Sequence, residues 1–325
     1  MLFRKIGRTG LKVSAFGIGT SFFGSHTNEA DAMQIMDIAF ENGINLFDTA
    51  NIYSGGKSEE LVGKFLKNKR HAVVLATKVA NRQGPGPNDL GLSRKHIMQA
   101  VETSLKRLDT DYIDIYYAHA PDYSTPIEET LRAFDNLVNQ GKVRYIACDN
   151  FHAWQLIKAL WVSDLHNLTH FISIQVPFNL ITRDIESELM PFCATEGVGI
   201  TVYNALAAGL LTGKYNHDQV PELNTRFRLE GIGPVDKERY WSFVNFEAVG
   251  RLKQIADAQG KSLTHFSLAW ILNNPSISSI IIGVSTSKQL ENNIKALEIK
   301  KTDDEIKGCD QVWQMLRPSR IFYGH

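Results

Sequence analysis

The sequence predicts an α/β fold in which eight parallel strands close into a barrel, the (β/α)8 or TIM-barrel arrangement. Apolar runs of strand length alternate with segments of helical period, a pattern typical of a parallel sheet wrapped by helices. Eight such units fit into 325 residues, a length that suits this barrel with extended loops after its strands. We therefore expect a single domain over residues 1–325.

The expected elements follow one another along the chain. A hairpin over residues 3–13 turns at Thr9 and Gly10 and is expected to close the bottom of the barrel. Helices are expected at 28–42, 93–108, 126–140 and 246–258, and the second of these repeats apolar residues on one face. The barrel strands are expected at residues 15–19, 45–49, 73–78, 113–119, 145–149, 172–176, 199–203 and 279–283.

A competing dinucleotide-binding fold fails a direct test. That fold needs the string G-x-G-x-x-G at its first strand-to-helix turn. Residues 17–22 read GIGTSF, which supplies only the first two glycines. The barrel interpretation remains.

Composition excludes several classes of function. Lys plus Arg and Asp plus Glu each number 35, so the formal net charge is zero, and nucleic-acid binding is not expected. Cys148, Cys193 and Cys309 form no close pair, and neither a disulfide framework nor a metal site is indicated. The N-terminal residues lack an apolar signal core, and no long apolar run could span a bilayer. We expect a cytoplasmic protein without a membrane partner.

Four polar residues lie at or just after the ends of expected strands, where a TIM barrel places its active site. Asp48, Lys78 and His119 end the second, third and fourth strands, and Tyr53 lies in the loop after the second. Reduction of a carbonyl group needs a proton donor, but an unperturbed tyrosine has a pKa of about 10. A neighbouring lysine would lower that pKa, and a carboxylate would hold the lysine in place.

The strings that carry these residues resemble those of the aldo-keto reductase superfamily. They are residues 47–59 (FDTANIYSGGKSE), 75–78 (LATK) and 115–122 (IYYAHAPD), and the resemblance extends from 4–11 (RKIGRTGL) to 289–293 (QLENN). It implies reduction of an aldehyde or ketone by NADP(H), or the reverse reaction, without a metal. Tyr53 would be the general acid, Lys78 and Asp48 would tune it, and His119 would orient the carbonyl oxygen.

The resemblance also implies how the nicotinamide end of the cofactor is held. Asn150 and Gln175 would hydrogen-bond the carboxamide, and Tyr203 would stack on the ring, although an ordinary core role for Tyr203 stays open. Asp149 stands where relatives commonly have serine. It could stabilise the oxidised, positively charged ring or take over the hydrogen bond of the serine, and the sequence does not decide between them.

The phosphate and adenosine ends map to two further segments. The loop 204–215 has small residues that allow close approach of the backbone, and it begins with Asn204 in place of a usual serine. The segment 283–293 would contact a 2′-phosphate through Ser285 and Lys288. NADP(H) is favoured and NAD(H) is the alternative, because Ser285 and Gln289 stand where many relatives carry an arginine. The residues assigned to these two ends are Asn204, Leu206, Gly209, Lys214, Arg226, Gly283, Ser285, Gln289 and Asn293.

Substrate and partners are the least determined. Aromatic residues in the strand-end loops suggest an apolar pocket for a small carbonyl or alcohol compound, or simply loop packing. A second interpretation is a cofactor-binding regulatory module, because the pattern also resembles the potassium-channel β-subunit branch of the superfamily. Members of that branch often oligomerise, so a homo-oligomer is an open alternative. With no extension before the expected hairpin, we expect no channel-inactivating segment.

Overall fold

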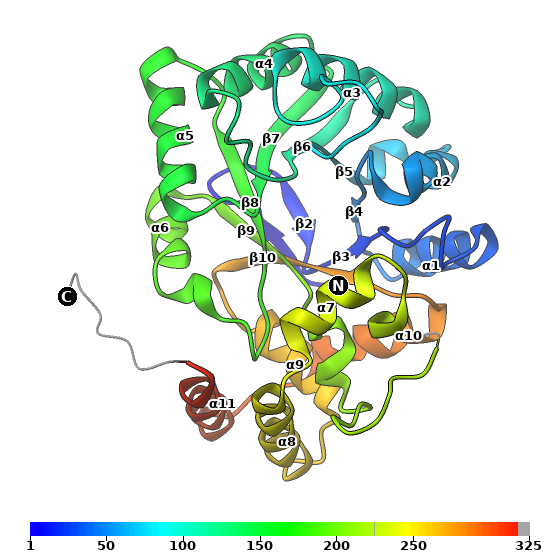
Figure 1. Ribbon diagram of the computed structural model, residues 1–325, viewed down its shortest axis with the longest axis vertical. Helices are drawn as coiled ribbons and strands as arrows, with labels where there is room; N and C mark the ends of the chain where they lie inside the picture. Colours follow the sequence, from blue (N-terminus) through cyan, green and yellow to red (C-terminus); the bar gives the residue numbers. More distant parts are fainter. Residues whose placement is uncertain (224, 318–325) are drawn as a thin grey trace. The chain divides into compact units, whose positions relative to one another are not determined.

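The computed structural model describes residues 1–223 and 225–317 (Figure 1). The sequence leaves open whether residues 321–325 cover a pocket or extend away from the barrel, and these residues lie outside the described part of the chain. The chain divides into two compact units. We call the first, Met1–Val176 with Ile185–Tyr203 and Ser276–Glu291, the barrel unit. The second unit comprises Pro177–Asp184, Asn204–Pro275 and Asn292–His325. The single domain over 1–325 stays a prediction.

The barrel unit contains the closed parallel barrel that the sequence predicts. Its strands follow the order β10-β3-β4-β5-β6-β7-β8-β9, so the last strand pairs with the first. Figure 1 shows helices α1 to α6 around these strands. The strands are β3 (Phe16–Gly19), β4 (Leu46–Asp48), β5 (Val74–Val79), β6 (Ile113–Ala118), β7 (Val143–Asp149), β8 (Phe171–Pro177), β9 (Gly199–Tyr203) and β10 (Ile277–Gly283).

Burial on both faces explains why the sequence identified these strands. Every residue of β4 and β5 is buried, because one face lines the barrel interior and the other lies under helices. The interior core joins side chains from most strands, including Leu46, Ala76 and Ile115. The carboxyl ends of β4, β5, β6 and β7 therefore lie at one rim, where their last side chains can meet.

Three helices of the barrel unit begin at capping side chains. Asn28 and Ser93 accept hydrogen bonds from backbone N–H groups at the starts of α1 and α3, and Gln155 Oε1 accepts from the backbone N–H of His152 at the start of α5. The helices are α1 (Glu29–Glu41), α2 (Lys57–Leu66), α3 (Arg94–Leu108), α4 (Ile127–Asn139), α5 (Ala153–His166) and α6 (Leu189–Glu196); α10 (Ser287–Ile294) follows β10.

The second unit is helical. It contains α7 (Ile232–Tyr240), α8 (Phe243–Asp257), α9 (Leu263–Leu272) and α11 (Asp303–Leu316). Helix α8 begins three residues before the expected 246 because the side chain of Ser242 accepts a hydrogen bond from the backbone N–H of Asn245. Across residues 1–223 and 225–317, we find no helix with both the length and the apolar character needed to cross a membrane.

The N-terminal hairpin closes the bottom of the barrel, as expected. Strands β1 (Phe3–Lys5) and β2 (Lys12–Ser14) are antiparallel. Ile6 and Val13 are fully buried in the interior core of the barrel. Gly7 has φ of 53°, and a Cβ there would lie 2.3 Å from the carbonyl oxygen of Gly197 and 2.7 Å from the backbone nitrogen of Gly199. This close backbone approach seats the hairpin at the start of β9.

We expect Gly7→Ala to lower the free energy of unfolding by about 2 kcal/mol or more, because the new methyl group would meet fixed backbone atoms at a left-handed φ. Urea denaturation would measure the loss. Gly10→Ala is the matched control in the same hairpin: nothing lies within 4 Å of its Cβ position, so its effect should stay within about 0.5 kcal/mol. Equal stability of the two variants would contradict this account of hairpin docking.

Candidate functional site

A buried ion pair joins the carboxyl ends of β4 and β5. Lys78 is fully buried, and its Nζ donates to Asp48 Oδ1 and, at 3.0 Å, to the carbonyl oxygen of Thr49. Asp48 Oδ2 accepts a hydrogen bond of 3.0 Å from Gln175 Nε2. Burial by itself lowers the pKa of Lys78, but the charge and the hydrogen bond of Asp48 are foremost among the interactions that outweigh it and raise the pKa above its ordinary value. Lys78 is therefore positively charged at neutral pH.

Tyr53 is brought to this pair by a tight loop after β4. The three residues that follow it all have positive φ, 50° at Ser54, 65° at Gly55 and 97° at Gly56, and glycine adopts such angles without steric cost. The Lys78 Nζ lies 5.3 Å from the centroid of the Tyr53 ring. The rings of Tyr53 and His119 meet edge to face with centroids 5.7 Å apart. The structure thus brings together Asp48, Tyr53, Lys78 and His119.

The net pKa of Tyr53 lies above its ordinary value, although Lys78 acts on it in the expected direction. Burial is the largest influence and raises the pKa of Tyr53 to about 12. The charge of Lys78 lowers the pKa, as the sequence suggested, but the carboxyl groups of Asp48 and Asp149 raise it again. The sequence motifs identified the charged neighbours of Tyr53. They could not show that burial of the Tyr53 hydroxyl has a larger effect on its pKa than those charges. Tyr53 consequently holds its proton throughout the neutral range.

His119 is held by a residue that the sequence interpretation missed. The side-chain Nδ2 of Asn81 lies 3.0 Å from His119 Nδ1. Because an amide nitrogen can only donate, Nδ1 accepts, and the neutral ring carries its proton on Nε2. Burial and the charge of Lys78 lower the pKa of His119 to about 3. A polar residue just after the end of β5 is the signal that would have identified Asn81, since the other site residues lie at equivalent positions.

Asp149 extends the same cluster at the end of β7. It is 2% exposed, and its Oδ2 lies 3.9 Å from His119 Nε2. Among the described residues its buried Oδ1 has no hydrogen-bond partner. Burial raises the pKa of Asp149 well above its ordinary value; the charge of Asp48 adds to this, and that of Lys78 opposes it. An unpartnered buried carboxyl oxygen beside a catalytic candidate favours a role in the chemistry.

Three residues assigned to the nicotinamide lie at neighbouring strand ends. Asn150 is exposed, and its left-handed φ of 61° turns the chain just after β7. Its Oδ1 accepts a hydrogen bond of 2.9 Å from the hydroxyl of Tyr203. Gln175 is buried and uses its Nε2 on Asp48, which leaves Oε1 to accept from a ligand. The stacking role of Tyr203 stays a prediction.

The adenosine-end residues of the barrel unit begin at Gly283, the last residue of β10. Gly283 is exposed, with nothing within 4 Å of its Cβ position. The backbone N–H and hydroxyl of Ser285 both donate to Gln289 Oε1, at 2.9 Å and 3.2 Å. Lys288 is exposed. Ser285 and Gln289 thus stabilise the start of α10, and their contact with a 2′-phosphate stays a prediction.

The second unit holds the remaining assigned residues. Its loop begins with Asn204, whose φ is 54° and whose carbonyl oxygen accepts a hydrogen bond of 3.0 Å from Asn179 Nδ2. Leu206 precedes the turn η4 (Ala207–Thr212), which contains Gly209 at φ of 93°. Lys214 is exposed and Asn293 is buried. Arg226 Nε lies 2.6 Å from the buried carboxylate of Asp236, so this cation is already partly neutralised.

Aromatic residues of the loops that follow the strands, which suggested an apolar pocket, divide between core and surface. Phe23, Phe151 and Tyr240 are at most 4% exposed and belong to the packed core. Tyr123 and Trp154 are 76% and 56% exposed. Loop packing therefore accounts for the first three, and the others remain available for contact with a ligand.

Comparison with known proteins agrees with this arrangement. Residues 15–314 match the model of the family described as "Aldo/keto reductase family". Relatives from Arabidopsis thaliana and Oryza sativa subsp. japonica, each named "Probable voltage-gated potassium channel subunit beta", are 37% identical over 92% of this chain and 92% of their own length. A "Putative voltage-gated potassium channel subunit beta" of Schizosaccharomyces pombe (strain 972 / ATCC 24843) is 38% identical over 95% of this chain and 92% of its own. The resemblance inferred from the motifs is confirmed, and the chain belongs to the aldo/keto reductase family.

Proposed function

We propose that this protein reduces an aldehyde or ketone to an alcohol with NADPH, or catalyses the reverse reaction, with Tyr53 as the general acid. Membership of the family implies an oxidoreductase that uses NAD(P)H and a small-molecule substrate. The observation that supports the finer proposal is the buried pair of Lys78 and Asp48 against the ring of Tyr53. We extend the proposal to a cytoplasmic location and leave a homo-oligomer as a prediction.

Tyr53 is suited to donating a proton rather than to removing one. With a pKa of about 12 it is protonated at neutral pH. When bound, the cofactor supplies the hydride to the carbonyl carbon. Tyr53 then gives its proton to the developing alkoxide, and the positive charge of Lys78 stabilises the phenolate that remains. Asp48 holds Lys78 in place through the buried ion pair.

His119 and Asp149 are suited to positioning the carbonyl group. Because Asn81 fixes the tautomer, His119 presents Nε2–H as a donor to the carbonyl oxygen. The low pKa of His119 keeps this ring neutral, so it does not compete with Tyr53 as an acid. Asp149 lies on the Nε2 side of the ring. Its raised pKa favours the protonated carboxyl group, which limits negative charge beside the developing alkoxide.

The residues present fit a nicotinamide dinucleotide. Gln175 Oε1 can accept from a carboxamide N–H, and Asn150 is exposed beside it with its side chain held by Tyr203. Lys288 supplies a cation at the start of α10, where backbone N–H groups also favour a phosphate. We assign the 2′-phosphate of NADPH to this end, with Ser285 and Gln289, and keep NADH as the alternative cofactor.

A second candidate function follows from the names of the relatives. Three of them are named as voltage-gated potassium channel β subunits, so a regulatory subunit that binds the cofactor is the alternative. A screen of NADPH oxidation against aldehydes, ketones and quinones separates the two. Turnover of any of these classes with normal saturation supports the enzyme. Tight NADPH binding without turnover across the screen supports the regulatory module.

We expect Tyr53→Phe to lower kcat at least about a hundredfold, the usual scale for loss of a general acid. NADPH affinity, measured by quenching of intrinsic fluorescence, should change little. Tyr145→Phe removes the same hydroxyl near the start of β7, away from the strand end that carries Asp149, and should leave kcat unchanged. Near-normal turnover by Tyr53→Phe would remove Tyr53 from the mechanism.

We expect Lys78→Met to slow the proton-transfer step and to shift its alkaline limb to higher pH. The sign follows from charge: Lys78 lowers the pKa of Tyr53, so its loss raises that pKa and makes Tyr53 a weaker acid. The readout is the pH dependence of kcat where a deuterated-cofactor isotope effect shows that chemistry limits the rate. Circular dichroism must first show that the variant is folded, because Asp48 loses its buried partner. If the variant is slower but the alkaline limb of its pH profile is unchanged, the role of Lys78 is purely structural.

We expect Lys288→Ala to weaken NADPH binding roughly tenfold or more and NADH binding much less. A charge-assisted hydrogen bond contributes about 1.5 to 3 kcal/mol, and 1.4 kcal/mol corresponds to a factor of ten. Fluorescence titration with each cofactor measures the difference. Lys158→Ala, on the exposed face of α5, loses the same charge and should affect neither. Equal weakening of both cofactors, or tighter NADH binding by the unmodified protein, would overturn the NADP(H) assignment.

A further inference from the structure

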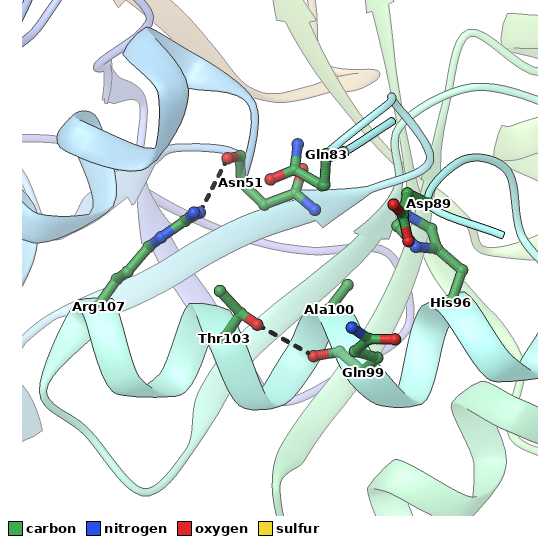
Figure 2. A pocket seen from close by; sticks show the side chains of 9 residues that line it. Asn51, Gln83, Asp89, His96, Gln99, Ala100, Thr103 and Arg107 are labelled. Carbon is green, nitrogen blue, oxygen red and sulfur yellow. Dashed lines mark hydrogen bonds between the residues drawn. The ribbon is translucent and has the colours of Figure 1, made fainter. Parts of the chain in front are cut away.

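The loop after β4 that carries Tyr53 lies against the last turn of α3. Arg107, in that turn, donates from Nη1 to the carbonyl oxygen of Asn51 at 3.1 Å, a bond drawn as a dashed line in Figure 2. The backbone N–H of Asn51 donates to the carbonyl oxygen of Lys78 at 3.3 Å. Both polar groups of the Asn51 backbone are therefore held, one by a helix and one by β5, two residues before Tyr53.

A buried carboxylate fixes the guanidinium group of Arg107. Glu59 is fully buried, and its Oε2 lies 3.2 Å from Arg107 Nη1. Its Oε1 accepts a hydrogen bond of 2.7 Å from the hydroxyl of Thr77, the residue before Lys78 in β5. Because a buried carboxylate needs a partner for its charge, Glu59 and Arg107 hold each other in place. The pair joins α2, α3 and β5 next to the loop.

The guanidinium group also lies against Gly56, three residues after Tyr53. A Cβ at Gly56 would lie 2.3 Å from the guanidinium carbon, 2.5 Å from Nη1 and 2.6 Å from Nε of Arg107. The backbone of Gly56 is thus packed directly on that side chain. The segment 51–56, which contains Tyr53, contacts Arg107 at both of its ends.

Packing does not hold the guanidinium group on its remaining side. Arg107 lines a cavity of about 200 Å³ between the loop after β4, the loop after β5 and α3 (Figure 2), and its side chain is 24% exposed. Its orientation therefore depends on the polar contacts with Asn51 and Glu59. Lysine carries the same charge but lacks the planar group with several N–H donors, so it cannot reproduce both contacts in the same geometry.

We propose that Arg107 is a positioning residue for the reaction and holds the segment 51–56 so that the ring of Tyr53 stays against Lys78. The three residues after Tyr53 all have positive φ, and such a conformation persists only where its surroundings enforce it. Arg107 lies on a helix and acts through the loop. The inference rests on the proposed function in one respect, the role of Tyr53 as the proton donor.

Arg107→Lys tests the proposal by two measurements. We expect hydrogen exchange of the backbone amides of residues 50–56, followed by mass spectrometry, to become at least about tenfold faster, because the loop loses an anchor. We expect kcat, measured where chemistry limits the rate, to fall roughly tenfold, because a small displacement of a catalytic group costs this much. KM and NADPH affinity should change little. In a Tyr53→Phe background the same substitution should lower kcat no further, because Arg107 acts through the Tyr53 hydroxyl.

Arg70→Lys is the matched control. Arg70 also pairs with a partly buried carboxylate, that of Asp114 at 2.7 Å, but this pair lies at the starts of β5 and β6, away from Tyr53. The control should leave kcat and the exchange of residues 50–56 unchanged, even where it lowers the stability of the fold.

Glu59→Gln covers the case in which Arg107→Lys does not fold, as judged by circular dichroism. Glutamine keeps the shape of the side chain and removes the charge that orients the guanidinium group. Exchange of residues 50–56 should again become faster, and kcat should again fall.

Unchanged exchange of residues 50–56 in the folded variants would overturn the proposal, whether or not the protein reduces carbonyl groups. Faster exchange with an unchanged kcat would also refute it, and so would a further fall in kcat in the Tyr53→Phe background. Failure of the proposed function gives a different result, which is a normal kcat for Tyr53→Phe alone.

Discussion

The Lys78 ammonium and the Asp48 carboxylate are buried together at the carboxyl ends of β4 and β5, and the arrangement of the site depends on this pair. Removing one member would leave the other charged and unpaired in the barrel, which typically costs about 3 to 5 kcal/mol. The pair also forms hydrogen bonds with neighbouring residues, since Gln175 donates to Asp48 and Lys78 donates to the carbonyl oxygen of Thr49. Residues from β4, β5 and β8 are thereby fixed around the ring of Tyr53.

Burial sets the protonation states around that pair. It raises the pKa values of Tyr53 and Asp149 and lowers that of His119. Within this cluster Lys78 therefore carries positive charge beside a protonated tyrosine and a neutral imidazole, an arrangement that favours proton donation to an alkoxide. A second buried carboxylate is also paired, since Glu59 forms an ion pair with Arg107 of α3.

Much of the fold could be predicted because burial and chain geometry leave local signals. Strands buried on both faces appear as apolar runs, and the helix starts at Asn28 and Ser93 coincide with capping side chains. The start of α8 was placed three residues late because Ser242 caps it ahead of the first apolar residue used as its boundary. Asn81 was missed although it lies just after the end of β5, because only the packing of neighbouring strands shows its contact with His119, 38 positions away in the sequence.

The sequence by itself determined the barrel and the family and selected Asp48, Tyr53, Lys78 and His119 as candidates, because strand periodicity and short motifs are local properties of the chain. Only the tertiary structure decided the pKa values of these residues. The pKa of Tyr53 depends on how deeply its hydroxyl is buried and on the carboxyl groups that reach it from β4 and β7. The contact of Arg107 with Asn51 likewise becomes visible only when α3 packs against the loop after β4. Desolvation and long-range contacts arise from packing, and no local pattern encodes them.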